Sequence, residues 1–322
     1  MDNSIPQVLT VGRVSVDLYA QQSNANATNI DTFKKSVGGT STNVAVAAAL
    51  LGVEAATFTK VGDDEFGEYV RHALRETFNV DSRWVGTDPN LPTPLAFAIL
   101  DPPEDPRIIF YREPSAPDLQ IQTDEIPDEV IEQVPVLWIP ASRFHAEPSA
   151  TTVRTLLEQR GRRAHTVIDL DWRPMFWDSM ADAHAAISPM LDHCTMAVGN
   201  RTECEVAVGE SDPDRAADAL LERGLSAAIV KLGADGVMVA TPDRREVVPP
   251  FLVDVVCGLG SGDAFGGALC HGLVNDIDLV EAVRNGNAAG AIVAGRLMCA
   301  DDMPTLPEIQ ELRAQREGTN ES

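Results

Sequence analysis

The sequence predicts an α/β protein with a mainly parallel sheet that is covered by helices on both faces. Short runs rich in β-branched residues, such as VLTVG from Val8 and TVIDLD from Thr166, alternate with segments of helical periodicity such as STNVAVAAALLG from Ser41. Several helical segments end at a glycine, which is typical of a helix C-terminus. Strands that alternate with helices in this way form βαβ units, whose parallel strands lie in one sheet.

The expected strands and helices follow one another along most of the chain. Apolar, β-branched runs predict strands in VLTVG (Val8), ATFTKVG (Ala56), VLWIP (Val136), TVIDLD (Thr166), TMAVG (Thr195) and AAIVKLG (Ala227). Apolar residues at helical spacing predict helices in STNVAVAAALLG (Ser41), EFGEYVRHALRETF (Glu65), PSATTVRTLLEQRG (Pro148) and PDRAADALLERG (Pro213).

Two stretches break this alternation. Residues 14–37 are polar and irregular, whereas residues 93–112 contain two strand patterns, PLAFAIL and RIIFYR, joined by the turn sequence DPPEDP. We expect a small antiparallel sheet that stands off the main domain as a lid. The chain is thus predicted to be a single domain over residues 1–322, with lid segments at about 14–37 and 93–112 and a disordered tail at 313–322.

Charge and composition exclude several classes of partner. The chain of 322 residues has a net charge of -24, so its average field repels nucleic acids and anionic membranes. It contains no run of eighteen apolar residues and no basic segment followed by an apolar one at its start, and we expect a cytoplasmic protein. The cysteines form no CxxC pair, which favours reduced thiols over a zinc site or disulfides: Cys194, Cys204, Cys257, Cys270 and Cys299.

The stretch GLGSGDAFGG, from Gly258 to Gly267, holds five glycines and a single carboxylate, Asp263. If this glycine turn opens a helix, the backbone N–H groups of Gly260 to Asp263 point outward at its positive N-terminus, where a phosphate or a developing anion can bind. Asp263 could instead cap the helix. Capping requires one side chain and does not explain five glycines, so the stretch favours an anion site.

The known phosphate-binding motifs do not match this stretch. A Walker A loop requires GxxxxGK[ST], but no glycine of this stretch precedes a lysine, and Asp263 occupies the third glycine position of GxGxxG. The chain also has no HRD catalytic loop. P-loop enzymes, Rossmann dehydrogenases and protein kinases are therefore not supported.

Several motifs together resemble the ribokinase-like (PfkB) carbohydrate kinases. GSGDAFGG is similar to the family's GAGD signature, and VGGTSTNVAVAAALLGVEAATFTKVGDDEFG, from Val37 to Gly67, is similar to its amino-terminal signature. VGRVSVD near the start, NRTE from Asn200 and VKLGADGV from Val230 also match, in the family's order. The resemblance implies a ribokinase-like three-layer sandwich with a mainly parallel central sheet and a small β lid, and an ATP-dependent kinase that uses Mg²⁺.

The resemblance also implies roles for particular residues. In phosphoryl transfer a protein positions the reactants, neutralises charge and supplies a base for the acceptor hydroxyl. Asp263 is the candidate base, and the amides of Gly260, Ser261 and Gly262 are the candidate cradle for the transferred group. Asp17, Gly38, Gly39 and Asn43 match positions that bind the acceptor, and Asn200, Lys231, Gly233, Gly236, Gly258 and Asn287 match positions at the nucleotide. Asn200 and Glu203 could hold the water shell of Mg²⁺, or could simply begin a helix.

Two further stretches, FYREPSAPDLQI from Phe110 and DLDWRPMFW from Asp169, resemble one branch of the family, the 5-dehydro-2-deoxygluconokinases of inositol catabolism. The 2-keto-3-deoxygluconate kinases share a weaker form of both. In these stretches Tyr111, Arg112 and Arg173 are candidate substrate-binding residues, because an arginine can grip a carboxylate through two hydrogen bonds.

These expectations give a kinase for the 6-hydroxyl of a keto-deoxy sugar acid, with ATP and the sugar acid as its small-molecule partners and the lid as a candidate surface for a homodimer. 5-Dehydro-2-deoxy-D-gluconate is the favoured substrate, and 2-keto-3-deoxygluconate or another sugar is the alternative. A catalytically idle sensor of nucleotide and sugar would need the pocket but not Asp263. One departure stands out: Cys257, Gly258 and Leu259 replace the family's DTx before GSGD, which puts in doubt a monovalent-cation site that needs this acid.

Overall fold

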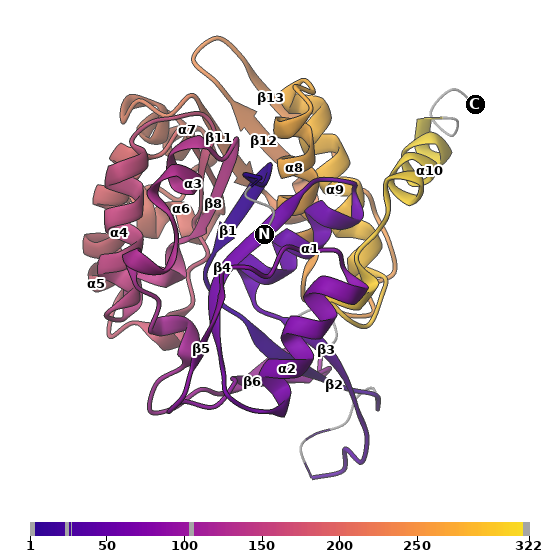
Figure 1. Ribbon diagram of the computed structural model, residues 1–322. Coiled ribbons are helices and arrows are strands. Elements are labelled where there is room, and N and C mark those ends of the chain that lie inside the picture. The colour runs from indigo at the N-terminus through magenta and orange to yellow at the C-terminus, as the bar shows by residue number, and fades with distance from the viewer. Residues whose placement is uncertain (1–3, 23–25, 27, 103–105, 318–322) are drawn as a thin grey trace.

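A nine-stranded sheet runs through the centre of the protein (Figure 1). The computed structural model describes residues 4–22, 26, 28–102 and 106–317. The strand order is β13 (Arg245–Val248), β12 (Val237–Ala240), β11 (Ala227–Lys231), β10 (Met196–Asn200), β9 (Thr166–Asp169), β8 (Val136–Pro140), β1 (Val8–Val11), β4 (Ala55–Gly62) and β5 (Val85–Asp88). β12 pairs in the antiparallel sense with both β11 and β13, and the other described pairs of this sheet are parallel, which confirms the predicted, mainly parallel sheet.

Helices cover both faces of this sheet and make three layers, as the sequence pattern predicts. One face is covered by α1 (Thr40–Leu50), α2 (Glu65–His72), α8 (Ser261–Val274) and α9 (Leu279–Ala294), and α10 (Leu306–Glu317) packs on α9. The other packs against α3 (Asp128–Gln133), α4 (Ser149–Arg160), α5 (Met180–Ile187), α6 (Arg201–Val208) and α7 (Pro213–Glu222). Successive strand residues point to opposite faces, so Trp138 joins the first core and its neighbours Leu137 and Ile139 join the second.

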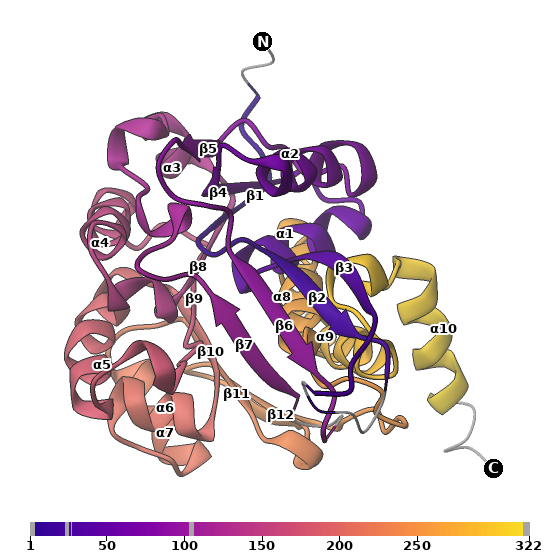
Figure 2. The ribbon, with the colours of Figure 1, turned by 90° about the horizontal axis from the view of Figure 1, so that it is seen from below.

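A second, four-stranded sheet lies beyond the end of β1 (Figure 2). Its order is β3 (Phe33–Gly38), β2 (Ser15–Ala20), β6 (Leu95–Ile99) and β7 (Arg107–Tyr111). The two strands expected in 93–112 are β6 and β7, which pair in the antiparallel sense from Leu95 opposite Tyr111 to Ile99 opposite Arg107. β2 and β3 lie in the segment 14–37, where the sequence pattern is irregular, and parts of both connecting loops fall outside the described residues.

Helix α8 makes an unusually close approach to its neighbours through two glycines. A Cβ atom on Gly266 would lie 2.9 Å from the indole of Trp138, and one on Gly267 would lie 2.8 Å from the backbone nitrogen of Ala48 in α1. Side chains at these two positions would push α8 away from α1 and β8. The glycines that follow Asp263 therefore serve helix packing.

The end of the chain differs from expectation. Helix α10 continues through Arg313, where the sequence predicts disorder, and ends at Glu317. The guanidinium of Arg313 donates hydrogen bonds of 2.6 Å to Asn285 Oδ1 and 2.7 Å to Glu281 Oε2, both in α9. These bonds to α9 explain why α10 continues past Arg313, and residues 318–322 of the predicted tail lie outside the described residues.

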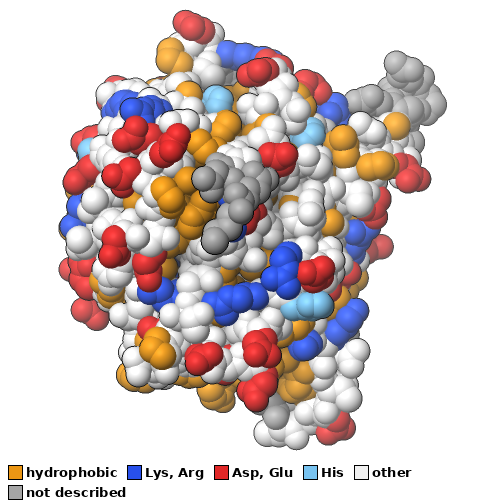
Figure 3. Space-filling model, in the orientation of Figure 1, with side chains coloured by type: hydrophobic (Ala, Val, Ile, Leu, Met, Phe, Trp, Pro, Cys, Tyr) orange, Lys and Arg blue, Asp and Glu red, His pale blue; other side chains and the backbone are white. Residues whose placement is uncertain are grey.

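Acidic side chains are spread over the molecular surface with lysines and arginines between them, as the face in Figure 3 shows. All five cysteines are buried and unpaired, which agrees with reduced thiols. Within the described part of the chain, no helix has both the length and the apolar character needed to span a membrane.

Candidate active site

The first backbone N–H groups of helix α8 have no side-chain cap. Its N-cap residue Gly260 has φ 82° and ψ -11°, in the left-handed region that glycine adopts most readily, and no side chain caps the first turn. A Cβ on Gly260 would also lie 2.5 Å from Cys299 Sγ, so packing as well as backbone geometry favours glycine. The first-turn N–H groups and the helix dipole thus remain available to an anion, as predicted for GSGD.

Two cavities lie on either side of this turn. The first is lined by Gly260 and Asp263 and by five predicted substrate-binding residues: Asp17, Gly39, Asn43, Arg112 and Arg173. The second is lined by Ser261 and Gly262 and by five predicted nucleotide-binding residues: Lys231, Gly233, Gly236, Gly258 and Asn287. The first turn of α8 therefore faces both cavities, which is the arrangement needed to pass a group from one ligand to another.

Asp263 lies in the first cavity as a partly buried carboxylate that does not cap its own helix. Burial raises the pKa of Asp263 to about 6, while a 2.8 Å hydrogen bond from Asn43 Nδ2 to Asp263 Oδ2 acts in the opposite direction. A carboxylate with this pKa is mostly ionised at neutral pH and can still accept a proton, which suits a general base. Asn43 is thus placed next to the candidate base and not at a helix cap.

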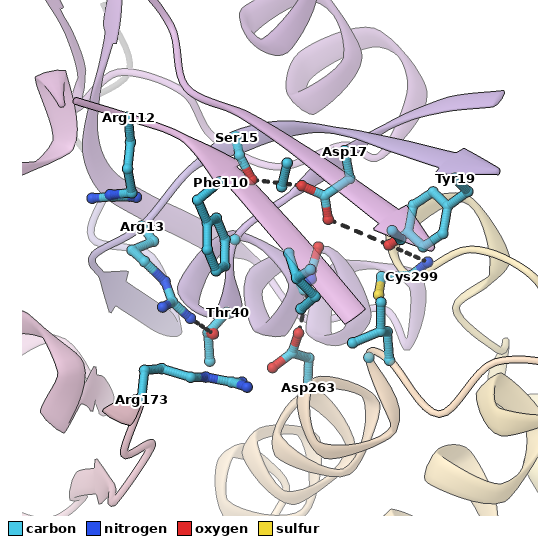
Figure 4. Close-up of a pocket in the computed structure, with 17 residues that line it drawn as sticks. Arg13, Ser15, Asp17, Tyr19, Thr40, Phe110, Arg112, Arg173, Asp263 and Cys299 are labelled. Atoms are coloured by element: carbon cyan, nitrogen blue, oxygen red, sulfur yellow. Dashed lines mark hydrogen bonds between the residues drawn. The ribbon is translucent and has the colours of Figure 1, made fainter. Parts of the chain in front are cut away.

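Asp17 comes to the same cavity from strand β2 (Figure 4). Ser15 Oγ donates to Asp17 Oδ1 at 2.6 Å, and the Tyr19 hydroxyl donates to Asp17 Oδ2 at 3.3 Å. Burial raises the pKa of Asp17 to about 6. A Cβ on Gly38, in the adjacent strand, would collide with this carboxylate, so Gly38 makes room for Asp17.

The two predicted arginines enter the cavity from different elements, and a buried aspartate holds each one. Both carboxylate oxygens of Asp118 lie 3.2 Å from Arg112 Nη2, and Arg143 Nη1 donates to the same group at 2.9 Å. Burial alone would raise the pKa of Asp118, but the charges of Arg112 and Arg143 outweigh it and lower the pKa. Arg173 Nε donates to Asp171 Oδ1 at 2.7 Å.

A third arginine, Arg13, lines the same cavity and is missed by the sequence reasoning. It follows β1 with only Gly12 between, and its exposed fraction is only 5%. In open α/β sheets ligands bind beyond the carboxyl ends of the strands, so its position after VLTVG was the available signal. Asp118 and Asp171 are missed too, because their part in holding arginines depends on contacts between distant segments.

Tyr111 does not reach the cavity, in contrast to our expectation. It is 65% exposed, and its ring packs against Phe97 with a centroid distance of 5.4 Å. Side chains alternate along a strand, so Ile108 and Phe110 of β7 face the cavity and Tyr111 points to the opposite face. Phe110 takes the place that was assigned to Tyr111.

Asn200 and Glu203 begin helix α6 with reciprocal hydrogen bonds. Asn200 Oδ1 accepts from the Glu203 backbone N–H at 3.0 Å, and Glu203 Oε2 accepts from the Asn200 N–H at 2.7 Å. These contacts match the alternative that Asn200 and Glu203 begin a helix. No cluster of three His, Cys, Asp or Glu side chains suited to a metal occurs among the described residues. One carboxylate oxygen of Glu203 is not used in the cap, which fits at most a contact to Mg²⁺ through water.

Lys231 stands at the end of β11, opposite Asn200 in β10. Its ammonium nitrogen lies 3.5 Å from the position that a Cβ on Gly262 would take, so it lies beside the first turn of α8. Burial alone would lower the pKa of Lys231, but the negative charges of Asp169, Glu203 and Asp263 outweigh burial and raise it. A charged lysine therefore adjoins the open amides of the helix.

The chain belongs to the pfkB family of carbohydrate kinases, whose model matches residues 6–306. It is an ATP-dependent carbohydrate kinase, as the sequence motifs imply. The Asp263 cavity and the Lys231 cavity are accordingly the candidate sites for the sugar and for the nucleotide.

Curated relatives and solved structures agree with this assignment. The chain is 33% identical over 306 residues to a 5-dehydro-2-deoxygluconokinase of Photobacterium profundum, covering 92% of this chain and 91% of that protein. It is 30% identical over 310 residues to a 5-dehydro-2-deoxygluconokinase of Geobacillus thermodenitrificans, covering 94% and 91%. A putative ribokinase II of E. coli, solved with ATP and Mg²⁺, has the same fold, with a TM-score of 0.87 at 22% identity over 96% of this chain and 99% of that one.

The first test concerns the candidate base. We expect Asp263→Asn to fold and bind ATP as the natural protein does, because Asn43 can still donate to the new amide oxygen. Its kcat should fall by about 10² to 10⁴-fold, because an amide cannot accept the hydroxyl proton. Asp276→Asn makes the same chemical change beyond the other end of α8 and should leave kcat unchanged. Turnover near the natural value in Asp263→Asn would remove Asp263 from the mechanism.

The second test uses the pH dependence. Burial raises the pKa of Asp263 to about 6, so the base is ionised above this pH and becomes protonated as the pH falls through it. We expect kcat/KM to be constant above the midpoint and to fall about tenfold per pH unit below it. Because the pKa of Asp17 is raised to a similar value, the profile is measured in Asp17→Asn as well. If kcat/KM of Asp17→Asn no longer fell at low pH, the fall would be assigned to protonation of Asp17 and not of Asp263.

Proposed function

We propose that this kinase transfers the γ-phosphoryl group of ATP to the 6-hydroxyl of a keto-deoxy sugar acid, most favourably 5-dehydro-2-deoxy-D-gluconate. The observation that carries this proposal is the presence of Arg112 and Arg173 in the same cavity as Asp263. A neutral sugar offers no anion to these guanidinium groups, whereas an acid does. The names of the curated relatives point to the same substrate.

In this proposal the sugar lies in the first cavity with its terminal hydroxyl at Asp263. Asp17 and Asn43 hold the other hydroxyl groups, with Gly39 giving access to the backbone, and the guanidinium groups receive the carboxylate. Asp263 accepts the hydroxyl proton as the oxygen attacks the γ-phosphorus, and the bond to the β-phosphate oxygen breaks so that ADP leaves.

The nucleotide lies in the second cavity, where the amides of Gly260, Ser261 and Gly262 and the ammonium of Lys231 receive its terminal phosphates. Gly233, Gly236 and Gly258 allow close approach to the backbone, and Asn287 borders the base. Asn287 Nδ2 donates to Pro249 O at 3.0 Å, which supports the wall of this cavity. Mg²⁺, bound through water at Asn200 and Glu203, would neutralise charge on the phosphates.

We also propose that the four-stranded sheet closes over the sugar and excludes water from the transfer. Hydrogen exchange across residues 95–112 should slow when the sugar acid is added, and unchanged exchange at saturation would contradict closure.

The opposite face of this sheet carries the exposed side chains of Phe33 and Tyr111, which pack on Phe97. Two copies of the chain could associate there, and a solution mass equal to one chain would exclude such a dimer.

The substrate class is tested by kinetics on three sugars. Arg112→Ala removes a charge-assisted hydrogen bond worth roughly 1.5 to 3 kcal/mol, so kcat/KM for the acid should fall about 10 to 200-fold. Fructose should be scarcely affected, because it has no carboxylate to lose. The measurement compares 5-dehydro-2-deoxygluconate, 2-keto-3-deoxygluconate and fructose in the natural protein, Arg112→Ala and Arg173→Ala.

Three outcomes would contradict the proposal or refine it. A uniform loss on all three sugars would show that the arginines support the fold or the nucleotide instead. A preference of the natural protein for fructose would refute the sugar-acid assignment. A preference for 2-keto-3-deoxygluconate would keep the substrate class and select the alternative acid, which the same guanidinium groups could bind.

A further inference from the structure

Arg13 is held firmly on one side of its guanidinium group and has no partner on the other. Its Nη2 donates to Thr40 Oγ1 and, at 3.2 Å, to Asp171 Oδ2. Its Nη1 is buried and meets no hydrogen-bond acceptor anywhere in the part of the chain that the structure describes. A buried N–H group without an acceptor costs free energy, and a ligand oxygen in the cavity would remove that cost.

The unpartnered group belongs to a side chain that lines the sugar cavity together with Arg112 and Arg173. The guanidinium carbons of Arg13 and Arg112 both lie 5.5 Å from the ring centroid of Phe176. One aromatic ring thus positions both cations. Figure 4 shows Arg13 and Arg112 on the side of the drawn site away from Asp17 and Tyr19, with the Arg173 guanidinium reaching from that side toward Asp263.

The aspartates at this end do not match the arginines in number. Asp171 is shared by Arg13 and Arg173, and Asp118 is shared by Arg112 and Arg143. In ion pairs these four guanidinium groups share two carboxylates, and the third nearby carboxylate, Asp263, acts on Arg13 and Arg173 only through its charge, which still leaves a local surplus of positive charge. Asp171 Oδ2 also accepts a 2.7 Å hydrogen bond from Ser142 Oγ, so the aspartate is already well supplied with donors. A bound anionic ligand would balance this excess positive charge.

We propose that Arg13 determines the selection of an acid over a neutral sugar by donating its Nη1 to the substrate carboxylate. This inference rests on the proposed function and adds a third arginine to the two that the sequence indicates. Thr40 and Asp171 fix the guanidinium plane before the substrate arrives, so little side-chain entropy is lost on binding. Lysine cannot reproduce this arrangement, because it carries all its N–H donors on one nitrogen and lacks the planar fork that places Nη2 at Thr40 and Asp171 and Nη1 at the substrate.

The test compares the sugar acid with its primary amide, which has nearly the same shape and no charge. We expect Arg13→Lys and Arg13→Gln each to lower the ratio of kcat/KM for acid over amide by about tenfold or more, mainly through KM for the acid. KM for ATP should stay the same. Arg160→Lys is the matched control, because Arg160 is 2% exposed and donates to Thr166 Oγ1 and Ile131 O at 2.7 Å, away from both cavities.

The possible results separate this inference from the proposed function. If the natural protein prefers the acid and the Arg13 variants lose activity equally on acid and amide, Arg13 is structural and the inference fails while the proposed function stands. If the natural protein prefers the amide or a neutral sugar, the proposed function itself fails. If both Arg13 variants unfold at a temperature where Arg160→Lys stays folded, Arg13 serves the fold and the inference is overturned.

Discussion

The close packing of helix α8 against α1 and β8 is the constraint on which the site depends. Gly266 and Gly267 let the backbone of α8 approach Trp138 and the middle and later turns of α1, and even one added methyl group at either glycine would require a shift of the helix. This approach brings Asn43 of α1 within 2.8 Å of Asp263 of α8. It also fixes the open helix N-terminus between the two cavities. The glycine-rich stretch is therefore a packing device and an anion site in the same sequence.

Local sequence patterns were sufficient for the fold class and for the centre of the site. The alternation of strands and helices depends on side-chain periodicity, and the helix opened by Gly260 depends on backbone freedom, so both can be read from a few neighbouring residues. Asp263 stands out in the glycine-rich stretch itself, whereas Asn43, Asp17 and Lys231 were implied by the resemblance to the PfkB kinases. The structure places all four beside the two cavities or in them.

Contacts between residues that are far apart in the sequence could not be predicted from local patterns. Strand alternation decides that Phe110 and not Tyr111 faces the cavity, but the phase of that alternation depends on which face of β7 is covered. Arg13 is 158 residues from its partner Asp171, and Arg313 is 28 residues from its partner Asn285 in α9. No pattern within one segment indicates such pairings.

The sharing of each buried aspartate by two arginines affects how the family's acceptor site can diversify. If Arg112 were replaced during evolution, Asp118 would keep Arg143 at 2.9 Å and would not become an isolated charge in the interior. The same holds for Asp171 with its two partners. Because each aspartate keeps one arginine when the other is substituted, the residues that contact the ligand can change one at a time without leaving a buried charge unpaired. Substitution of either aspartate is not compensated in this way, because two arginines would then lose the carboxylate that they share.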